Sequence, residues 1–379
     1  MNPIYLDYNG TTPIDKEVAD EMRTYLDERF GNPSSSHVYG EQAKEDLQLA
    51  RKRVAKLINC EPHEVIFTSG GTESNNHAIR GVAWHNQDKG KHIITSAIEH
   101  PAVIEVLKHL RDCGFTYTEV QVDESGILNP FDIEKAIKPE TILITVMHSN
   151  NEIGTLQPIR EIAQIAQKHK ITFHTDASQS MGKVDVDVQN LGCDLMTIAG
   201  HKVYAPKGIG ALYVKRGLKL QNLMFGAGQE RGIRPGTENM LEIVGLGKAC
   251  EVAKRDFEKN TANMKAMRDK LYTGLKEKVK DFRLNSNLDK NLPNTLNISI
   301  KGVDADTTLT LMDEHLSASA GAACHSDSVS VSSTIAAIGV PREFVRGTMR
   351  FTTGKHTTAD EIDRAIEIIA ETVKKLRGY

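Results

Sequence analysis

Residues 141–175 read TILITVMHSNNEIGTLQPIREIAQIAQKHKITFHT. Two short apolar runs, Thr141–Met147 and Thr172–Thr175, flank an amphipathic stretch of helical period at Ile159–His169. A strand, a helix and a second strand in this order are typical of two parallel strands in one sheet. The segment therefore predicts an α/β fold for the chain around it.

The same alternation extends over residues 62–215. Further strand candidates are Glu64–Thr68, His92–Ser96, Tyr117–Val122, Leu195–Ile198 and Ile209–Val214, and further helical stretches are Asn75–Gln87 and Val103–Cys113. This alternation predicts a mostly parallel central sheet covered by helices on both faces. Ligands of such sheets bind beyond the carboxyl ends of the strands, so residues that follow a strand are the candidates for a site.

The pattern changes after Asn239. Met240–Phe282 is charged and helix-periodic, strand candidates follow near Thr295–Ile300 and Thr348–Thr352, and a last amphipathic helix covers Ala359–Leu376. We expect a smaller α+β domain joined to the first by a long helix. The predicted boundaries are residues 12–258 for the large domain, and 1–11 with 259–379 for the small one.

Composition excludes several classes of protein. The 379 residues carry 47 Lys and Arg against 50 Asp and Glu, without the basic excess of a dedicated nucleic-acid binder. No apolar run reaches the about 18 residues of a membrane span, and the N-terminus lacks a secretory signal pattern. The five cysteines include no C-x-x-C pair, and the histidines show no ligand spacing. We expect a cytoplasmic protein with no metal site.

A glycine-rich turn, residues 69–76 (SGGTESNN), lies between a predicted strand and a helix. Its backbone N–H groups and the hydroxyl of Thr72 suit an anion, although a tight turn with a capped helix explains the pattern equally well. The chain contains neither a P-loop nor a Rossmann G-x-G-x-x-G fingerprint.

Three further side chains lie near strand ends. Asp176 follows an apolar strand, where a carboxylate needs a cationic partner such as a protonated pyridine nitrogen, or serves as a helix N-cap. Lys202 lies just past another strand, where a lysine held in a cleft forms an imine. His100 precedes Pro101 and suits stacking on a flat ring, or a purely structural role. At one sheet edge, this combination predicts a pocket for pyridoxal 5′-phosphate (PLP).

Over almost its whole length the chain resembles the class V (fold-type I) aminotransferase superfamily, and within it the cysteine desulfurases. The matching segments are residues 5–7 (YLD), 30–35 (FGNPSS), 68–76, 147–154 (MHSNNEIG), 176–179, 201–202, 234–237 (RPGT) and 321–324 (GAAC). The resemblance implies a PLP-dependent transferase, a large domain with a mostly parallel sheet and a smaller α+β domain.

The resemblance also assigns roles. It implies Lys202 as the Schiff-base lysine and His100 as the stacking, proton-shuttling residue. Cofactor-binding residues would be Gly71, Thr72, His100, Asn150, Asp176, Gln179, His201, Lys202 and, from a second subunit of a homodimer, Thr237. Asn150 and Arg350 would bind the substrate α-carboxylate. Cys324 would be the nucleophile.

These roles lead us to expect conversion of L-cysteine to L-alanine, with the sulfur left on Cys324 as a persulfide for an acceptor protein. Small residues over about 317–333 suit a mobile loop that carries this cysteine. The alternatives are a selenocysteine lyase, another class V PLP aminotransferase with an idle Cys324, and a feebly catalytic sulfur-transfer adaptor.

Some positions depart from the common family pattern. Ala199 stands where a phosphate-binding serine is usual, His325 follows the nucleophile, and residues 352–355 (TTGK) replace Ser-Leu-Gly-Arg. The chain ends at Tyr379, directly after its last helix, where housekeeping desulfurases carry a tail that docks an iron–sulfur scaffold protein. We therefore expect a specialised role in sulfur or selenium delivery.

Overall fold

The computed structural model describes residues 3–320, 322–325 and 328–378, with backbone alone for 322–325 and 328–331. Its largest sheet has seven strands in the order β2-β8-β7-β6-β5-β3-β4. The strands are β2 (Val65–Thr68), β3 (His92–Ser96), β4 (Thr116–Val120), β5 (Thr141–Thr145), β6 (Thr172–Asp176), β7 (Leu195–Ala199) and β8 (Gly210–Val214). Only β8 runs antiparallel to its neighbours, so the prediction of a mostly parallel sheet is confirmed.

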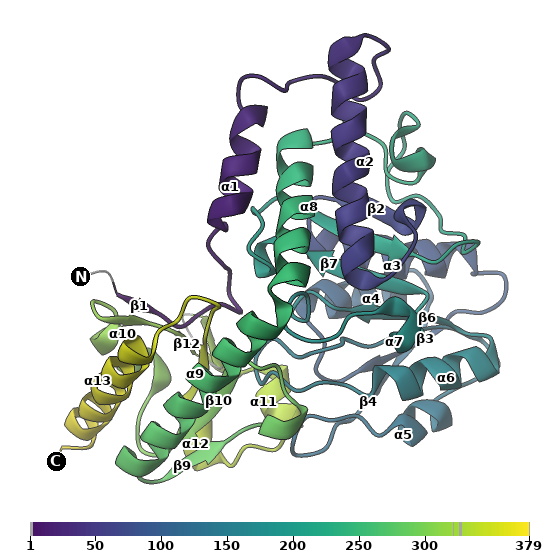
Figure 1. Cartoon of the computed structure of the whole chain (residues 1–379). Helices are drawn as coiled ribbons and strands as arrows, with labels where there is room; N and C mark the ends of the chain where they lie inside the picture. Colours follow the sequence, from purple (N-terminus) through teal and green to yellow (C-terminus); the bar gives the residue numbers. More distant parts are fainter. Residues whose placement is uncertain (1–2, 321, 326–327, 379) are drawn as a thin grey trace.

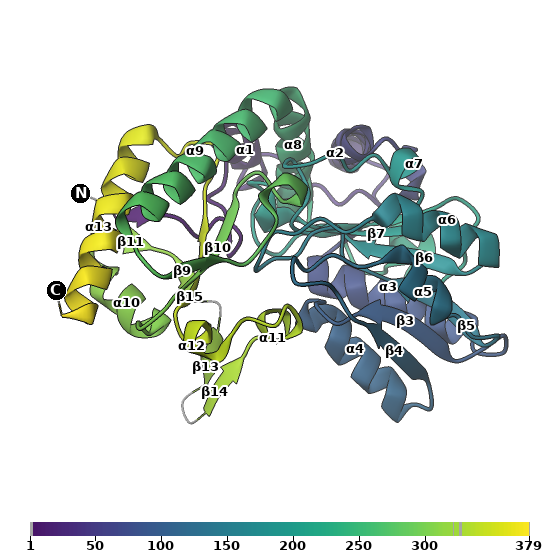
Figure 2. The same cartoon turned by 90° about the horizontal axis from the view of Figure 1, so that it is seen from below.

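Helices cover both faces of this sheet (Figure 2). On one face lie α3 (Gly71–His85) and α4 (Pro101–Asp112); on the other lie α2 (Val38–Ile58), α5 (Pro130–Lys135), α6 (Ile159–His169), α7 (Val188–Leu191) and α8 (Met240–Arg255), with α1 (Lys16–Met22) against α8. Alternation along β2 sends Ile66 into the core under α3 and α4, and Phe67 into the opposite one. A sheet buried on both faces needs this apolar composition.

A second core surrounds a four-stranded antiparallel sheet. Its strands, in sheet order, are β12 (Ser319–Ala320), β15 (Thr348–Thr352), β10 (Thr295–Ile300) and β9 (Phe282–Leu284). The helices α9 (Phe257–Lys278), α10 (Ala305–Met312) and α13 (Ala359–Arg377) contribute to this core. The N-terminal strand β1 (Ile4–Tyr5) joins it by parallel pairing with β11 (Leu316–Ser317), so both ends of the chain lie in this part of the molecule (Figure 1).

The prediction of one continuous helix over Met240–Phe282 is wrong in one respect. The structure divides it at Asp256, whose backbone (φ −103°, ψ 15°) is not helical, into α8 and α9. The reason is packing, since α8 belongs to the core of the large sheet and α9 to the second core. The chain must therefore turn where it passes from one core to the other, as Figure 1 shows.

The structure also differs from the prediction of a loop at about 317–333. The structure places strands β11 and β12 there, then an antiparallel hairpin of β13 (Ala322–His325) and β14 (Ser328–Val331), and then the start of α11 (Ser333–Ala337). Alternation of Ser and Val in residues 328–331 has the period of a strand, which accounts for the difference. Residues 321, 326 and 327 of the predicted loop lie outside the described residues.

The remaining elements are short. They are the helix α12 (Arg342–Val345) and the 3₁₀ turns η1 (Arg23–Tyr25), η2 (Pro62–Glu64), η3 (Gly200–Lys202), η4 (Gln229–Gly232) and η5 (Leu288–Lys290). In the described part of the chain, no helix has the length and apolar character needed to cross a membrane.

Candidate active site

A cavity of about 350 Å³ opens at the carboxyl edge of the parallel strands. Among the residues predicted for the site, it is lined by Gly71, Thr72, His100, Asp176, Gln179, His201, Lys202 and Arg350. These residues follow β2, β3, β6 and β7, apart from Arg350, which comes from β15 in the second core. The cavity therefore lies between the two cores.

The glycine-rich turn forms one end of this cavity. Gly70 has φ +150°, which side-chain-bearing residues rarely adopt, and this turn directs the chain from β2 into α3. The first N–H groups of a helix have no partner within the helix. Together with the Thr72 hydroxyl they form a site for an anion at the start of α3.

The carboxylate of Asp176 lies at the end of β6 and is 6% exposed. One oxygen accepts a hydrogen bond from Asn75 Nδ2 at 2.7 Å and the other from the Ser178 N–H at 2.9 Å. Both donors are neutral, so the charge that they stabilise stays available to a cation in the cavity. A buried carboxylate of this kind is costly to the fold unless such a cation binds.

Lys202 follows β7 and lines the same cavity. Its Nζ donates to the carbonyl oxygens of Asn9 at 2.5 Å and Gly10 at 2.6 Å. Burial, reinforced by the positive charge of Arg350, lowers the pKa of Lys202 to about 8, although Asp7 and Asp176 act in the opposite direction. A substantial fraction of this amine is therefore neutral near physiological pH, as a nucleophilic lysine requires.

The two predicted histidines have different surroundings. His100 caps α4: its Nδ1 accepts from the Ala102 N–H at 3.0 Å, so the proton of the neutral ring is on Nε2. His201 Nδ1 lies 3.1 Å from Thr11 Oγ1. Burial, together with Lys202 and other lysines, lowers the pKa of His201 to about 4, so it is a neutral group in the cavity.

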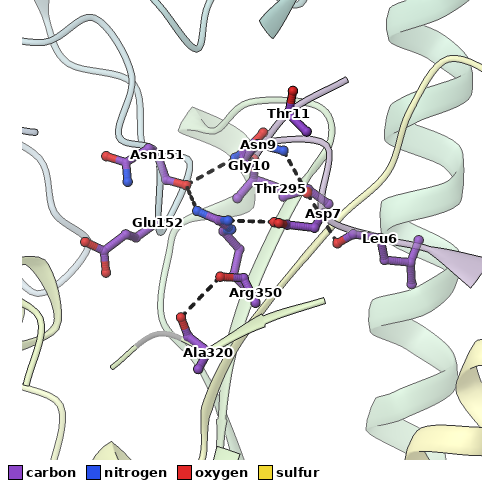
Figure 3. Close-up of polar contacts among 12 residues, drawn as sticks. Leu6, Asp7, Asn9, Gly10, Thr11, Asn151, Glu152, Thr295, Ala320 and Arg350 are labelled. Atoms are coloured by element: carbon purple, nitrogen blue, oxygen red, sulfur yellow. Dashed lines mark hydrogen bonds and ion pairs between the residues drawn. The ribbon is translucent and has the colours of Figure 1, made fainter. Parts of the chain in front are cut away.

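Arg350 is anchored by two contacts (Figure 3). Its Nη2 forms an ion pair with Asp7 at 2.6 Å, and its Nη1 donates to the Asn151 carbonyl oxygen at 2.8 Å. Asp7 fits there because Gly10 has no side chain: a Cβ at Gly10 would lie 2.2 Å from Asp7 Oδ2. The guanidinium is thus held at the cavity wall with donors to spare for an anion.

The structure contradicts the predicted position of Asn150. This side chain is fully buried: its Nδ2 donates to the Ile98 carbonyl oxygen, and its Oδ1 accepts from the N–H groups of Glu152 and Ile153. The neighbouring Asn151 lines the cavity instead. The tight turn after β5 directs the first asparagine inward, where its amide satisfies backbone groups, and the second outward.

Two predicted residues lie elsewhere. Thr237 is exposed and does not line the cavity of its own chain. Cys324 is placed by its backbone in β13, opposite Val329 of β14, and its side chain lies outside the described part of the chain. The four cysteines whose side chains are described are Cys60, Cys113, Cys193 and Cys250. Burial raises the pKa of both Cys60 and Cys250 to about 12, which disfavours the reactive thiolate.

Sequence reasoning missed several residues of the site. Asn9 and Gly10 line the cavity from the N-terminal segment, Asn75 binds Asp176, and Lys183 lies behind Gln179. Only the matching Tyr5-Leu6-Asp7 segment signalled that the N-terminus is near the site. The expectation that site residues follow a strand could not find them, because none of these four residues directly follows one.

A sheet of this topology, with a lysine, an aspartate and an anion cradle at its carboxyl edge, defines a fold-type I transferase. The Aminotransferase class-V family matches residues 4–365, and the chain belongs to this family. The resemblance inferred from the sequence is thereby confirmed.

Curated relatives extend over almost the whole chain. Cysteine desulfurase IscS of Dictyoglomus turgidum is 44% identical and is matched over 99% of this chain and 95% of its own. The protein of the same name from Methanosarcina thermophila is also 44% identical, over 99% of this chain and 93% of its own.

Two solved structures superpose on almost the whole chain. A NifS-like protein superposes with a TM-score of 0.93 at 33% identity, over 99% of this chain and 100% of its own. SspA in complex with cysteine has a TM-score of 0.80 at 36% identity, over 93% of this chain and 99% of its own.

Proposed function

We propose that this protein is a PLP-dependent cysteine desulfurase that converts L-cysteine to L-alanine and transfers the sulfur to Cys324. The observation that carries the proposal is the joint placement of Lys202, Asp176 and the start of α3 around one cavity. The names of the relatives at 44% identity, and the solved SspA complex with cysteine, support the same activity.

The residues present fit PLP. Asp176 is a buried carboxylate with neutral donors only in the described structure, which suits a protonated pyridine nitrogen. The start of α3, Thr72 and neutral His201 suit the phosphate, and Gln179 suits the ring oxygen. Ala199 leaves this cradle without the hydroxyl that a serine there would add. PLP, when bound, supplies the electron sink for chemistry at the substrate Cα.

The chain's own groups then divide the work. Lys202, with its lowered pKa, would hold the cofactor, and its amine would be the group that takes the Cα proton. His100 would stack on the ring, with its Nδ1 bonded to the Ala102 N–H and its Nε2–H free to donate a proton there. Arg350 binds the substrate carboxylate, and we transfer the role predicted for Asn150 to Asn151, which contacts the same guanidinium.

A homodimer is part of the proposal. Thr237 is exposed and would complete the cofactor site of a partner subunit. Large apolar side chains also lie exposed around the start of α2 and at residue 225, including Phe225 at 84%, Val38 at 75% and Phe30 at 70%. The acceptor protein, the preference for sulfur or selenium and the cytoplasmic location remain predictions from the sequence.

The sulfur-carrying role of Cys324 is tested by mass spectrometry after incubation with L-cysteine. We expect one additional sulfur on the peptide that contains Cys324, and none on the Cys324→Ser variant, which keeps its visible cofactor absorption. Cys113→Ser serves as the control, because Cys113 is the exposed cysteine among those described. Extra sulfur at Cys60, Cys113, Cys193 or Cys250 in the wild-type protein would contradict the assignment.

A further inference from the structure

Lys183 is a buried cation with an unusual set of partners. It lies in the turns between β6 and α7, is 4% exposed, and lies behind the wall of the cavity. Its Nζ donates to Gln179 Oε1 at 3.2 Å and to Asn9 Oδ1 at 3.4 Å. The charged groups that act on it are Lys202 and Arg350, both cations.

Such an environment is costly for an ammonium group. Burial, with the two neighbouring cations, lowers the pKa of Lys183 to about 7. Methionine would fill a similar volume without this cost, so the amino group needs an explanation in terms of what it binds. The negative charge of a bound phosphate and ring oxygen would favour the protonated form.

Lys183 fixes the orientation of two side-chain amides. In its protonated form Lys183 only donates hydrogen bonds, so the atom of each amide that faces it is then the oxygen. Gln179 is thereby held with its Nε2 on the other side, where it donates to the Asn9 carbonyl oxygen at 2.9 Å. That nitrogen keeps a second hydrogen for a group in the cavity that Gln179 lines.

Asn9 is oriented by the same logic. Its Oδ1 also accepts from Asn294 Nδ2 at 3.0 Å, and its Nδ2 donates to Thr295 Oγ1 at 2.9 Å (Figure 3). With the side chain held in this way, the Asn9 carbonyl oxygen receives hydrogen bonds from both Gln179 and Lys202. The buried Lys183 thus helps to hold both the Gln179 amide and, through Asn9, the Lys202 amine at the cavity.

We propose that Lys183 is a positioning residue: it holds the Gln179 amide with its nitrogen toward the cavity, so that Gln179 donates a hydrogen bond to the anionic ring oxygen of the cofactor. Without Lys183 only the hydrogen bond to the Asn9 carbonyl oxygen would hold this orientation, and a rotated amide would present an acceptor to the ring oxygen, which is repulsive. The inference rests on the proposed PLP enzyme and adds a residue outside the cavity lining.

The test is a double-mutant cycle on cofactor binding, with Lys183→Met, Gln179→Leu and the double variant. Cofactor-free proteins are titrated with PLP, and both the dissociation constant and the visible band are recorded. We expect each single variant to raise the dissociation constant about 10- to 100-fold, as for the loss of one hydrogen bond to a charged group. We also expect the same band shift in both, and little further change in the double variant. Lys219→Met, at an exposed lysine, is the control and should bind like the wild type.

A Gln179→Glu variant keeps Lys183 in place and remains informative if Lys183→Met does not fold. Its carboxylate would pair with Lys183 and stabilise the cofactor-free protein, yet offer the ring oxygen only acceptors, so PLP binding should weaken. Additive effects in the cycle, or tight PLP binding by Gln179→Glu, would overturn the inference while leaving the function intact. A wild-type protein that gives no visible band with PLP would overturn the proposed function and the inference with it.

Discussion

Several buried ionisable side chains around the cavity form no ion pair in the described part of the chain. Asp176, Lys183 and Glu99 are each at most 6% exposed, and the Lys202 amine is bonded to two carbonyl oxygens. Each such group, when it is charged, lowers the stability of the protein without cofactor, because its charge is removed from water. Sites that bind a charged cofactor often contain groups of this kind. The ionisation of Lys202 and of Glu99 can be tested directly.

The reaction of Lys202 with PLP should follow the ionisation of its amine. Only the neutral amine attacks, and the pKa of Lys202 is lowered to about 8. The rate at which the visible band appears on mixing should therefore rise with pH and level off above a midpoint near 8. A midpoint near the 10.5 of an ordinary lysine would contradict the described environment. Lys202→Ala should give no such band at any pH.

Glu99 should make the stability depend on pH. Burial raises its pKa to about 8; Oε1 accepts from Ser96 Oγ and the Met147 N–H. The folded protein retains this proton where the unfolded chain, with a pKa near 4.5, has lost it. The stabilisation is thus complete below about pH 4.5 and is lost as the pH rises toward 8.

Glu99→Gln removes this ionisation. Denaturant unfolding of the cofactor-free protein between pH 5 and 9 should show a smaller decline of the free energy of unfolding in the variant than in the wild type. Equal declines would mean that Glu99 is not held protonated in the fold.

The roles of single residues were predictable only where a strand end or a matching motif placed them. Asp176, Lys202 and His100 follow strands, and the structure places all three at one cavity. Asn150 was predicted to lie at the cavity and Asn151 lines it instead, because two adjacent asparagines in a turn point to opposite sides, which no pattern in the sequence reveals. Asn9 and Lys183 were missed because their roles depend on contacts between segments far apart in the chain.

At the level of elements, apolar composition was the reliable signal. β3, β10, β15 and α6 have the predicted boundaries, because the three strands are short runs buried in a core and α6 buries one apolar face of regular helical period. The predicted helix Met240–Phe282 was wrong because its break depends on which core each half contacts. The segment around Cys324 was predicted as a loop, since its small residues gave no strong apolar pattern.

The turn between β2 and α3 is the element most open to a test. Gly70→Ala places a Cβ at φ +150°, which should cost about 1–3 kcal/mol of stability. It should also weaken PLP binding by displacing the start of α3. The matched control is Gly114→Ala at φ +87°, which follows α4 and should reduce stability while leaving PLP affinity unchanged. Equal PLP affinity in the two variants would argue against an anion site at this turn.

At the scale of the whole molecule, the two cores support the predicted division into residues 12–258 and residues 1–11 with 259–379, which we retain as a proposal. The cavity needs both parts, because Arg350 comes from the second core and Lys202 from the first. The N-terminal segment contacts both parts, since Leu6 lies in the second core while Asn9 accepts from Lys202.

The proposed homodimer predicts complementation between inactive variants. Light scattering should give about twice the chain mass of 41.9 kDa. Thr237→Ala alone should weaken PLP binding at both sites, and Lys202→Ala should abolish attachment. Mixed dimers of these two variants should regain one normal site, because the intact Thr237 belongs to the chain that lacks Lys202. No recovery on mixing would indicate that Thr237 does not act across the interface.

The proposed cysteine desulfurase activity is tested most directly by measuring alanine release from L-cysteine by the purified, PLP-loaded protein in the presence of a reductant. L-Selenocysteine is measured beside it, and Lys202→Ala is the control. We expect catalytic release of alanine from L-cysteine, with sulfide appearing in equal amount and neither product from the variant. Alanine from L-selenocysteine alone, or from neither substrate, would contradict the proposed activity.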